Sequence, residues 1–179
     1  DFAAENLPSA KNLYRVTKWT AMALKSRVCL YEGTWRKYHA MEGYETYLKA
    51  AAEASEMFID NSPYTIYSAG EQPYRDLFAA DKAKAEEVIL ARNYYSALSI
   101  VHSANLYFLS GGPSPGMNKK VVNSYLMKDG TRFTDLPNYN SIQYYDEMQN
   151  RDPRLAQTIV TPGYKRIGES TVTNVNFGA

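Results

Sequence analysis

Residues 13–32, with the sequence LYRVTKWTAMALKSRVCLYE, decide the fold class because their apolar side chains recur at helical spacing. Two apolar rows and one basic face run along this segment. The first row consists of Val16, Trp19, Ala23 and Leu30, and the second of Ala21, Leu24, Val28 and Tyr31. The basic face consists of Arg15, Lys18 and Lys25. A helix on a protein surface has a single apolar stripe, so two rows predict a helix packed between neighbours on both sides. We expect this helix to end at Gly33, because glycine is common just after the last helical residue.

A second helical pattern covers residues 43–61 and stops before Pro63, since the residue before a proline disfavours the helical conformation. Its apolar positions are Tyr44, Tyr47, Leu48, Ala51, Ser55, Phe58 and Ile59. Because small alanine side chains allow close approach, we predict that residues 15–32 and 44–60 pack as antiparallel helices. Ala54 and Phe58 also fit the A-x3-F element of the tetratricopeptide repeat.

The rest of the chain has no long periodic segment. Short strands are expected at 64–67, 87–91 and 155–161, and short helices at 74–78, 118–127 and 141–149. The predicted fold is therefore mainly α. A tetratricopeptide-like helical hairpin at 13–62 forms the scaffold, and 63–179 forms a loop-rich part with short strands and helices.

Composition excludes several classes of function. The 179 residues carry 20 Lys and Arg against 19 Asp and Glu, and a net charge of +1 gives no electrostatic footprint for nucleic acid. A single cysteine, Cys29, allows no disulfide within the chain, and we expect it to be a buried, unmodified thiol within the first helix. No segment is apolar enough to span a bilayer, and the N-terminus has no signal-peptide pattern.

The sequence also lacks recognisable catalytic motifs. Residues 111–116 have the glycine spacing of a phosphate loop, but the lysine that should follow is absent. His39 and His102 belong to no metal-ligand array. Two pairs of adjacent acids remain: Glu86-Glu87 and Asp146-Glu147. Adjacent side chains point apart on a helix or a strand, so neither pair predicts an acid–base couple. We therefore predict no enzyme, no cofactor and no metal site.

Tyrosine is frequent, with 16 residues, and several tyrosines stand in aromatic pairs. The pairs are Tyr94-Tyr95, Tyr107-Phe108 and Tyr144-Tyr145. An aromatic ring offers a flat face for the C–H side of a sugar ring, and neighbouring amides and hydroxyls can bond sugar hydroxyls. The competing interpretation is that most of these rings pack in the core.

Several motifs occur in an order that is typical of one family. They are RVTK at 15–18 within the first helix, the helix and turn at 47–64, the segments 74–78 and 86–90, VNSYLMKDG at 122–130 and NRDPRL at 150–155. By these motifs the chain resembles the SusD/RagB family of nutrient-binding outer-membrane lipoproteins.

The resemblance implies a mostly helical protein with tetratricopeptide-like hairpins as scaffold and a loop-rich face for the ligand. It implies a surface-exposed outer-membrane lipoprotein that captures glycans without catalysis and delivers them to a SusC-like TonB-dependent transporter. Because members of the family are longer and carry a lipidated N-terminal cysteine, we expect this chain to be an internal section, with the anchor outside it.

The same resemblance places the ligand face beside the segment that follows residues 86–90. Here that segment is Asn93, Tyr94 and Tyr95, and we rank Tyr95 first. One of the two rings should face outward and the other inward, because successive side chains of an extended segment alternate. Tyr107 and Phe108 are expected to form a second edge of the site. Peptide capture, a helical protein-interaction scaffold and an unrecognised hydrolase remain the alternatives.

Overall fold

The computed structural model describes residues 1–103, 116–165 and 170–171. The chain is mainly helical, as predicted, and it divides into two compact units. The first unit is formed by Asp1–Ser68 and Ala80–Ile100, and the second by Ala69–Ala79 and Val101–Ala179. Each unit has its own packing and is described by itself.

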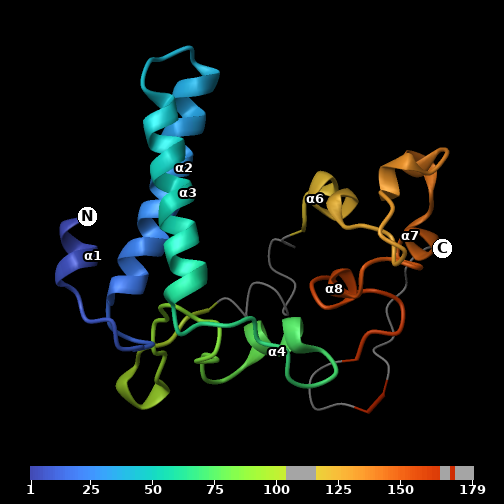
Figure 1. Ribbon diagram of the computed structural model, residues 1–179. Coiled ribbons are helices and arrows are strands. Elements are labelled where there is room, and N and C mark those ends of the chain that lie inside the picture. Colours follow the sequence, from blue (N-terminus) through green and yellow to red (C-terminus); the bar gives the residue numbers. More distant parts are fainter. Residues whose placement is uncertain (104–115, 166–169, 172–179) are drawn as a thin grey trace. The chain divides into compact units, whose positions relative to one another are not determined.

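The first unit is built on a helical hairpin. Helix α2 (Lys18–Tyr38) and helix α3 (Tyr44–Asn61) lie side by side in opposite directions, joined by a short turn (Figure 1). Ala51 and Ala54 are buried, and the hydroxyls of Ser26 and Ser55 lie 2.6 Å apart. The predicted antiparallel pair is confirmed, with small side chains at its contact as expected.

Helix α2 begins later than the sequence pattern suggested, at a capping box formed by two threonines. The Thr17 side chain accepts from the Thr20 backbone N–H, and the Thr20 hydroxyl accepts from the Thr17 backbone N–H. Both N–H groups lie before the first intrahelical bonds, so side chains satisfy them. Thr17 is 2% exposed, which places this cap inside the unit.

Gly33 does not end α2, contrary to our expectation, because the helix continues to Tyr38. The role of this glycine is close contact. A Cβ atom at this position would lie 2.7 Å from Leu48 Cδ2 and 3.1 Å from the Leu48 backbone nitrogen. Glycine at this position therefore lets α3 approach α2 closely. In the sequence it looks like a glycine that ends a helix, but its role is packing.

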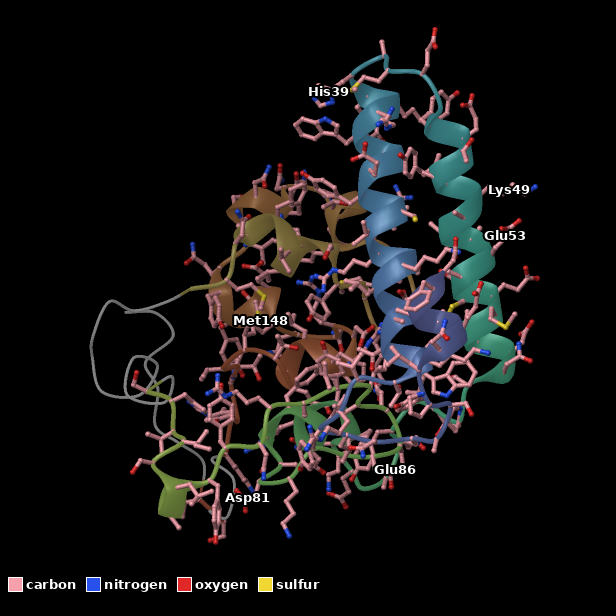
Figure 2. All side chains as sticks on the ribbon, turned by 90° about the vertical axis from the view of Figure 1, so that its left-hand side faces the viewer. His39, Lys49, Glu53, Asp81, Glu86 and Met148 are labelled. Carbon is pink, nitrogen blue, oxygen red and sulfur yellow. The ribbon has the colours of Figure 1, made fainter. Side chains whose placement is uncertain are left out.

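One apolar row of helix α2 has no cover in the described part of the chain, so the prediction of neighbours against both rows is wrong there. The second apolar row is open to solvent, with Leu24 60%, Val28 54% and Tyr31 66% exposed. Cys29 is a free thiol but only half-buried, so its predicted burial is also wrong. On α3, Lys49 and Glu53 point away from α2 (Figure 2), as a solvent-facing ion pair should.

Aromatic rings and extended segments close the base of the hairpin. The Phe58 ring stacks on Tyr64 and meets Trp19 edge to face, with centroid distances of 5.7 and 6.0 Å. The Trp19 indole N–H donates to the Ser9 carbonyl at 2.7 Å. The short helix α1 (Phe2–Asn6) is tied to α2 by an ion pair between Asp1 and Lys25.

The strands predicted at 64–67 and 87–91 are not formed. The Thr65 N–H donates to the Glu86 carbonyl at 2.9 Å, whereas the Tyr67 N–H donates to the Glu87 carboxylate at 2.7 Å. A side-chain acceptor at the second position interrupts the backbone ladder that a strand pair requires. Residues 64–67 therefore form no regular element, and the chain at 84–88 forms a turn in which the Lys84 carbonyl accepts from the Glu87 and Val88 N–H groups at 3.3 and 2.9 Å.

The second unit consists of short helices and turns. They are α4 (Pro73–Ala79), α6 (Lys119–Ser124), η2 (Phe133–Asp135), η3 (Tyr139–Ser141), α7 (Tyr144–Glu147) and α8 (Pro153–Ala156). The predicted helices at 74–78, 118–127 and 141–149 are confirmed as α4, α6 and α7, although α6 and α7 are shorter than predicted. Beyond α6 the chain is extended, since Leu126 pairs with Arg132 and Met127 with Arg151.

A buried arginine holds the centre of the second unit. Arg151 is 6% exposed, and its guanidinium donates to the carbonyls of Val122, Tyr125 and Glu147 at 2.8–3.0 Å. The guanidinium carbon lies 4.0 Å from the ring centroid of Phe133, which is 1% exposed. Burial lowers the pKa of Arg151, while the nearby Glu147 charge opposes that shift. One side chain thus satisfies the carbonyls at the end of α6 and joins three segments.

The strand predicted at 155–161 is also absent. Asp152 caps α8 by accepting from the Arg154 N–H at 2.9 Å, and Pro153 opens the helix with its fixed φ. Leu155 is 1% exposed and packs with Val122 and Met148. The apolar run that suggested a strand is therefore a helical turn facing the core.

Candidate functional site

Asn93, Tyr94 and Tyr95 lie in the first unit, where Tyr95 opens a tight turn. Tyr95 and Ile100 exchange two backbone hydrogen bonds, of 2.8 and 3.2 Å. Between them are the short helix η1 (Ser96–Leu98) and Ser99, which has a left-handed backbone with φ of 56°. The turn fixes the backbone of Tyr95 and directs the chain back on itself.

Both tyrosine rings are open to solvent. Tyr94 is 48% and Tyr95 55% exposed, so the expectation that one of them packs inward is wrong. The Arg92 guanidinium lies 5.6 Å from the Tyr94 ring centroid, and Asn93 between them is exposed. Tyr107 and Phe108, the expected second edge, lie outside the described residues.

This turn offers the chemistry of a stacking surface. Exposed phenol rings present flat apolar faces, and their hydroxyls can both donate and accept hydrogen bonds. The Asn93 amide adds two donors and one acceptor beside them, and Arg92 adds a cation. The group can hold a flat polar ligand, such as a sugar ring, on an open face.

The tyrosine pair at 144–145 has a partly structural role. The Tyr144 hydroxyl donates to the Val160 carbonyl at 2.6 Å, and burial raises the pKa of this hydroxyl. Tyr145 is 56% exposed. For Tyr144, the interpretation as core packing is therefore the better one.

One acid in each of the two adjacent pairs has a structural partner. Glu147 is 4% exposed and forms an ion pair with Lys119, whereas Glu87 accepts from the Tyr67 N–H. Asp146 is exposed. Among the described residues, no three His, Cys, Asp or Glu side chains gather to hold a metal ion.

The second unit contains a cavity that sequence reasoning missed. Its volume is about 530 Å³, and it is lined by Lys120, Asn123, Ser124, Leu126, Arg132, Thr134 and Tyr139. These residues come from α6 and from the turns that return along it. The signal available in sequence was the Asp129-Gly130 turn, which brings Arg132 back beside Leu126.

The fold and these surfaces define a helical protein with ligand-binding chemistry on its turns. The chain belongs to the SusD family, whose sequence pattern matches residues 77–177, more than half of the chain. No individual curated protein and no solved structure gives a significant match. The family consists of nutrient-binding proteins that are associated with the outer membrane. In the described part of the chain, no helix has the length and apolar character needed to cross a membrane.

Proposed function

We propose that this chain is part of a non-catalytic protein that captures glycans at the cell surface and delivers them to a SusC-like TonB-dependent transporter. The observation that carries the proposal is membership of the SusD family over residues 77–177. The proposal includes an outer-membrane lipoprotein of which these 179 residues form one section of a SusD-like domain.

The exposed turn at Asn93–Tyr95 supports glycan capture. Two rings with 48% and 55% exposure lie beside an amide, which is the combination that binds sugar faces and sugar hydroxyls together. Such a site buries little area, and its hydroxyls compete with water, so binding by one section of the protein should be weak to moderate.

One acid of each adjacent pair, Glu87 and Glu147, has a structural partner, which favours binding over hydrolysis. A pair that hydrolyses glycosides holds its two carboxyl groups on either side of one bond, about 5–10 Å apart. Glu147 is engaged by Lys119 in the core, and Glu87 holds the Tyr67 backbone. Clean protein should therefore release no reducing ends from any glycan it binds.

Peptide capture by the same kind of protein is the second candidate. The exposed Tyr94 and Tyr95 favour it as well, since tyrosines also supply rigid contact area for peptides. A panel of immobilised glycans and unstructured peptides, presented to the 179-residue chain, separates the two. Binding to peptides alone would replace glycan capture by peptide capture.

The residue test compares two tyrosines of the first unit. Tyr95→Ala should weaken binding to the glycan found in the panel by about three- to tenfold, because it removes one stacking ring. Tyr38→Ala is the control, since Tyr38 is 82% exposed on α2, away from the proposed turn in sequence. Equal affinity of Tyr95→Ala and wild type would remove Tyr95 from the site.

A further inference from the structure

The cavity of the second unit indicates which class of glycan the chain binds. Its volume of about 530 Å³ falls within the range of about 300–1,000 Å³ that is usual for small-molecule sites. It is an open hollow that lies along α6 and is bordered by residues of the segment from Leu126 to Tyr139, all within one unit.

The charge of its lining has one sign. Lys120 and Arg132 line the cavity together with neutral residues, and none of the described residues that line it is an aspartate or a glutamate. In the described ranges neither cation has an ion-pair partner, whereas the adjacent Lys119 pairs with Glu147. Asp129 and Asp135 are the acids nearest to Arg132 along the chain, each three residues away. Neither forms an ion pair with Arg132 in the part of the chain that the structure describes, and Asp129 accepts a hydrogen bond from the Thr131 hydroxyl at 2.7 Å. Two cations without counter-charges attract an anion.

The remaining lining groups suit a sugar that bears the anion. A guanidinium such as that of Arg132 matches the two oxygens of a carboxylate or the oxygens of a sulfate ester. Ser124 and Thr134 supply hydroxyls. The Tyr139 ring is held by an edge-to-face contact with the buried Phe133, with centroids 6.0 Å apart, so it is a fixed apolar wall.

One further observation points to an absent donor. The side-chain oxygen of Asn123 is enclosed, and within the described part of the chain nothing donates a hydrogen bond to it. Buried polar groups are nearly always paired, with protein groups or with ordered water, so this oxygen can take a donor that the protein does not supply.

We propose that this cavity binds an acidic sugar residue, bearing a carboxylate or a sulfate ester, within a captured glycan. The inference rests on the proposed function and names its substrate class. Lys120 and Arg132 bind the anionic group, Tyr139 contacts the ring, and Ser124, Thr134 and Asn123 bond its hydroxyls.

The test uses pairs of probes that differ in charge. Oligogalacturonate is compared with its methyl ester, and chondroitin sulfate oligosaccharide with its desulfated form, by calorimetry at low salt. The wild-type chain should prefer the charged member of at least one pair, and the pair it prefers identifies carboxylate or sulfate. Raising the salt concentration should weaken that binding, because screening acts on exposed charges.

The variants carry matched charge changes. Arg132→Gln should weaken binding of the charged probe by about ten- to hundredfold, the loss of a charge-assisted bond. Lys120→Gln should weaken it too, and it serves if Arg132→Gln fails to fold. Lys128→Gln removes the same charge from an exposed residue of the same unit that does not line the cavity, and it should bind like wild type.

The outcomes separate this inference from the proposed function. Equal affinity for charged and uncharged members, or an equal loss with Lys128→Gln, would overturn the inference. Binding of neutral glycans that depends on Tyr95, with no binding of acidic ones, would overturn it and leave the proposed function standing. Binding of oligoglutamate with no glycan bound would contradict both.

Discussion

The hairpin of the first unit and the core of the second are held together in different ways. In the hairpin, α2 and α3 satisfy their own backbones, and small residues such as Ala54 let them pack closely. In the second unit, elements of three to seven residues leave many carbonyls without helical partners, and the Arg151 side chain bonds three carbonyls. The first kind of stability is spread over many contacts, whereas the second depends on one residue.

The largest expected effect comes from removing that residue. Arg151→Met keeps the apolar stem but removes three hydrogen bonds, and among the described residues only the Val122 carbonyl keeps another donor, the Tyr125 N–H at 3.3 Å. The second unit should therefore lose about 3 kcal/mol or more of stability. Hydrogen exchange read by mass spectrometry should show faster exchange for residues 119–156 and little change for 18–61. Arg154→Met is the control, because its ion pair with Asp152 is exposed and is worth about 0–1 kcal/mol. An equal loss of stability with Arg151→Met and Arg154→Met would contradict the claim that the second unit depends on Arg151.

The next effect is on the hairpin contact. Gly33→Ala places a Cβ against Leu48, and overpacking should cost about 1–3 kcal/mol, offset in part by about 1 kcal/mol of helix propensity. Exchange should rise in 18–61 and not in 119–156. Adding Leu48→Ala should recover part of the loss, since the nearest clashing atoms belong to that side chain. A gain in stability with Gly33→Ala alone would show that Gly33 is not a contact residue.

A smaller effect is expected at the start of α2. Thr17→Ala removes the buried N-cap and should cost about 1 kcal/mol in thermal unfolding. Thr34→Ala is the matched control in the same helix. Its hydroxyl bonds the Leu30 and Tyr31 carbonyls inside the helix, and its loss should be neutral or slightly stabilising. A larger loss of stability with Thr34→Ala than with Thr17→Ala would refute the capping role of Thr17.

The smallest effect concerns pH. Hydrogen bonding to Arg154 lowers the pKa of Asp152, so the carboxylate contributes stability above its unfolded pKa of about 3.9 and loses it as pH falls through the lower folded pKa. Asp152→Asn can still cap α8 but lacks the charge, so it should be less stable than wild type by under about 1 kcal/mol at pH 7. The difference in unfolding midpoint should shrink toward pH 3. A constant difference across this range would exclude an ionic contribution.

The sequence predicted the part of the fold that depends on periodic local patterns. The hairpin was predicted from apolar spacing over about five helical turns. Only the ends of its helices differ from the prediction. Gly33 was misinterpreted because a glycine that ends a helix and one that admits a neighbour have the same local sequence. The apolar run at Leu155 was misinterpreted because Asp152 and Pro153 start a helical turn before a strand can form.

The candidate binding residues also include some that the sequence predicted and some that it did not. Tyr94 and Tyr95 were predicted as ligand-binding residues from the family motifs, but the exposure of both rings was not predicted. The cavity around Arg132 was not predicted. The Asp129-Gly130 turn indicates the pairing of Leu126 with Arg132, but the packing of Tyr139 on Phe133 and of this segment along α6 depends on tertiary contacts that no local pattern encodes.

Glycan capture without catalysis is tested most directly by one incubation with two readings. The 179-residue chain is mixed with each glycan of a neutral and acidic panel, and bound glycan and new reducing ends are measured in the same sample. We predict saturable binding of at least one glycan and no increase in reducing ends over time. No glycan bound at millimolar concentration, or reducing ends that grow with the protein and stop when Glu87 or Asp146 is replaced, would contradict the account.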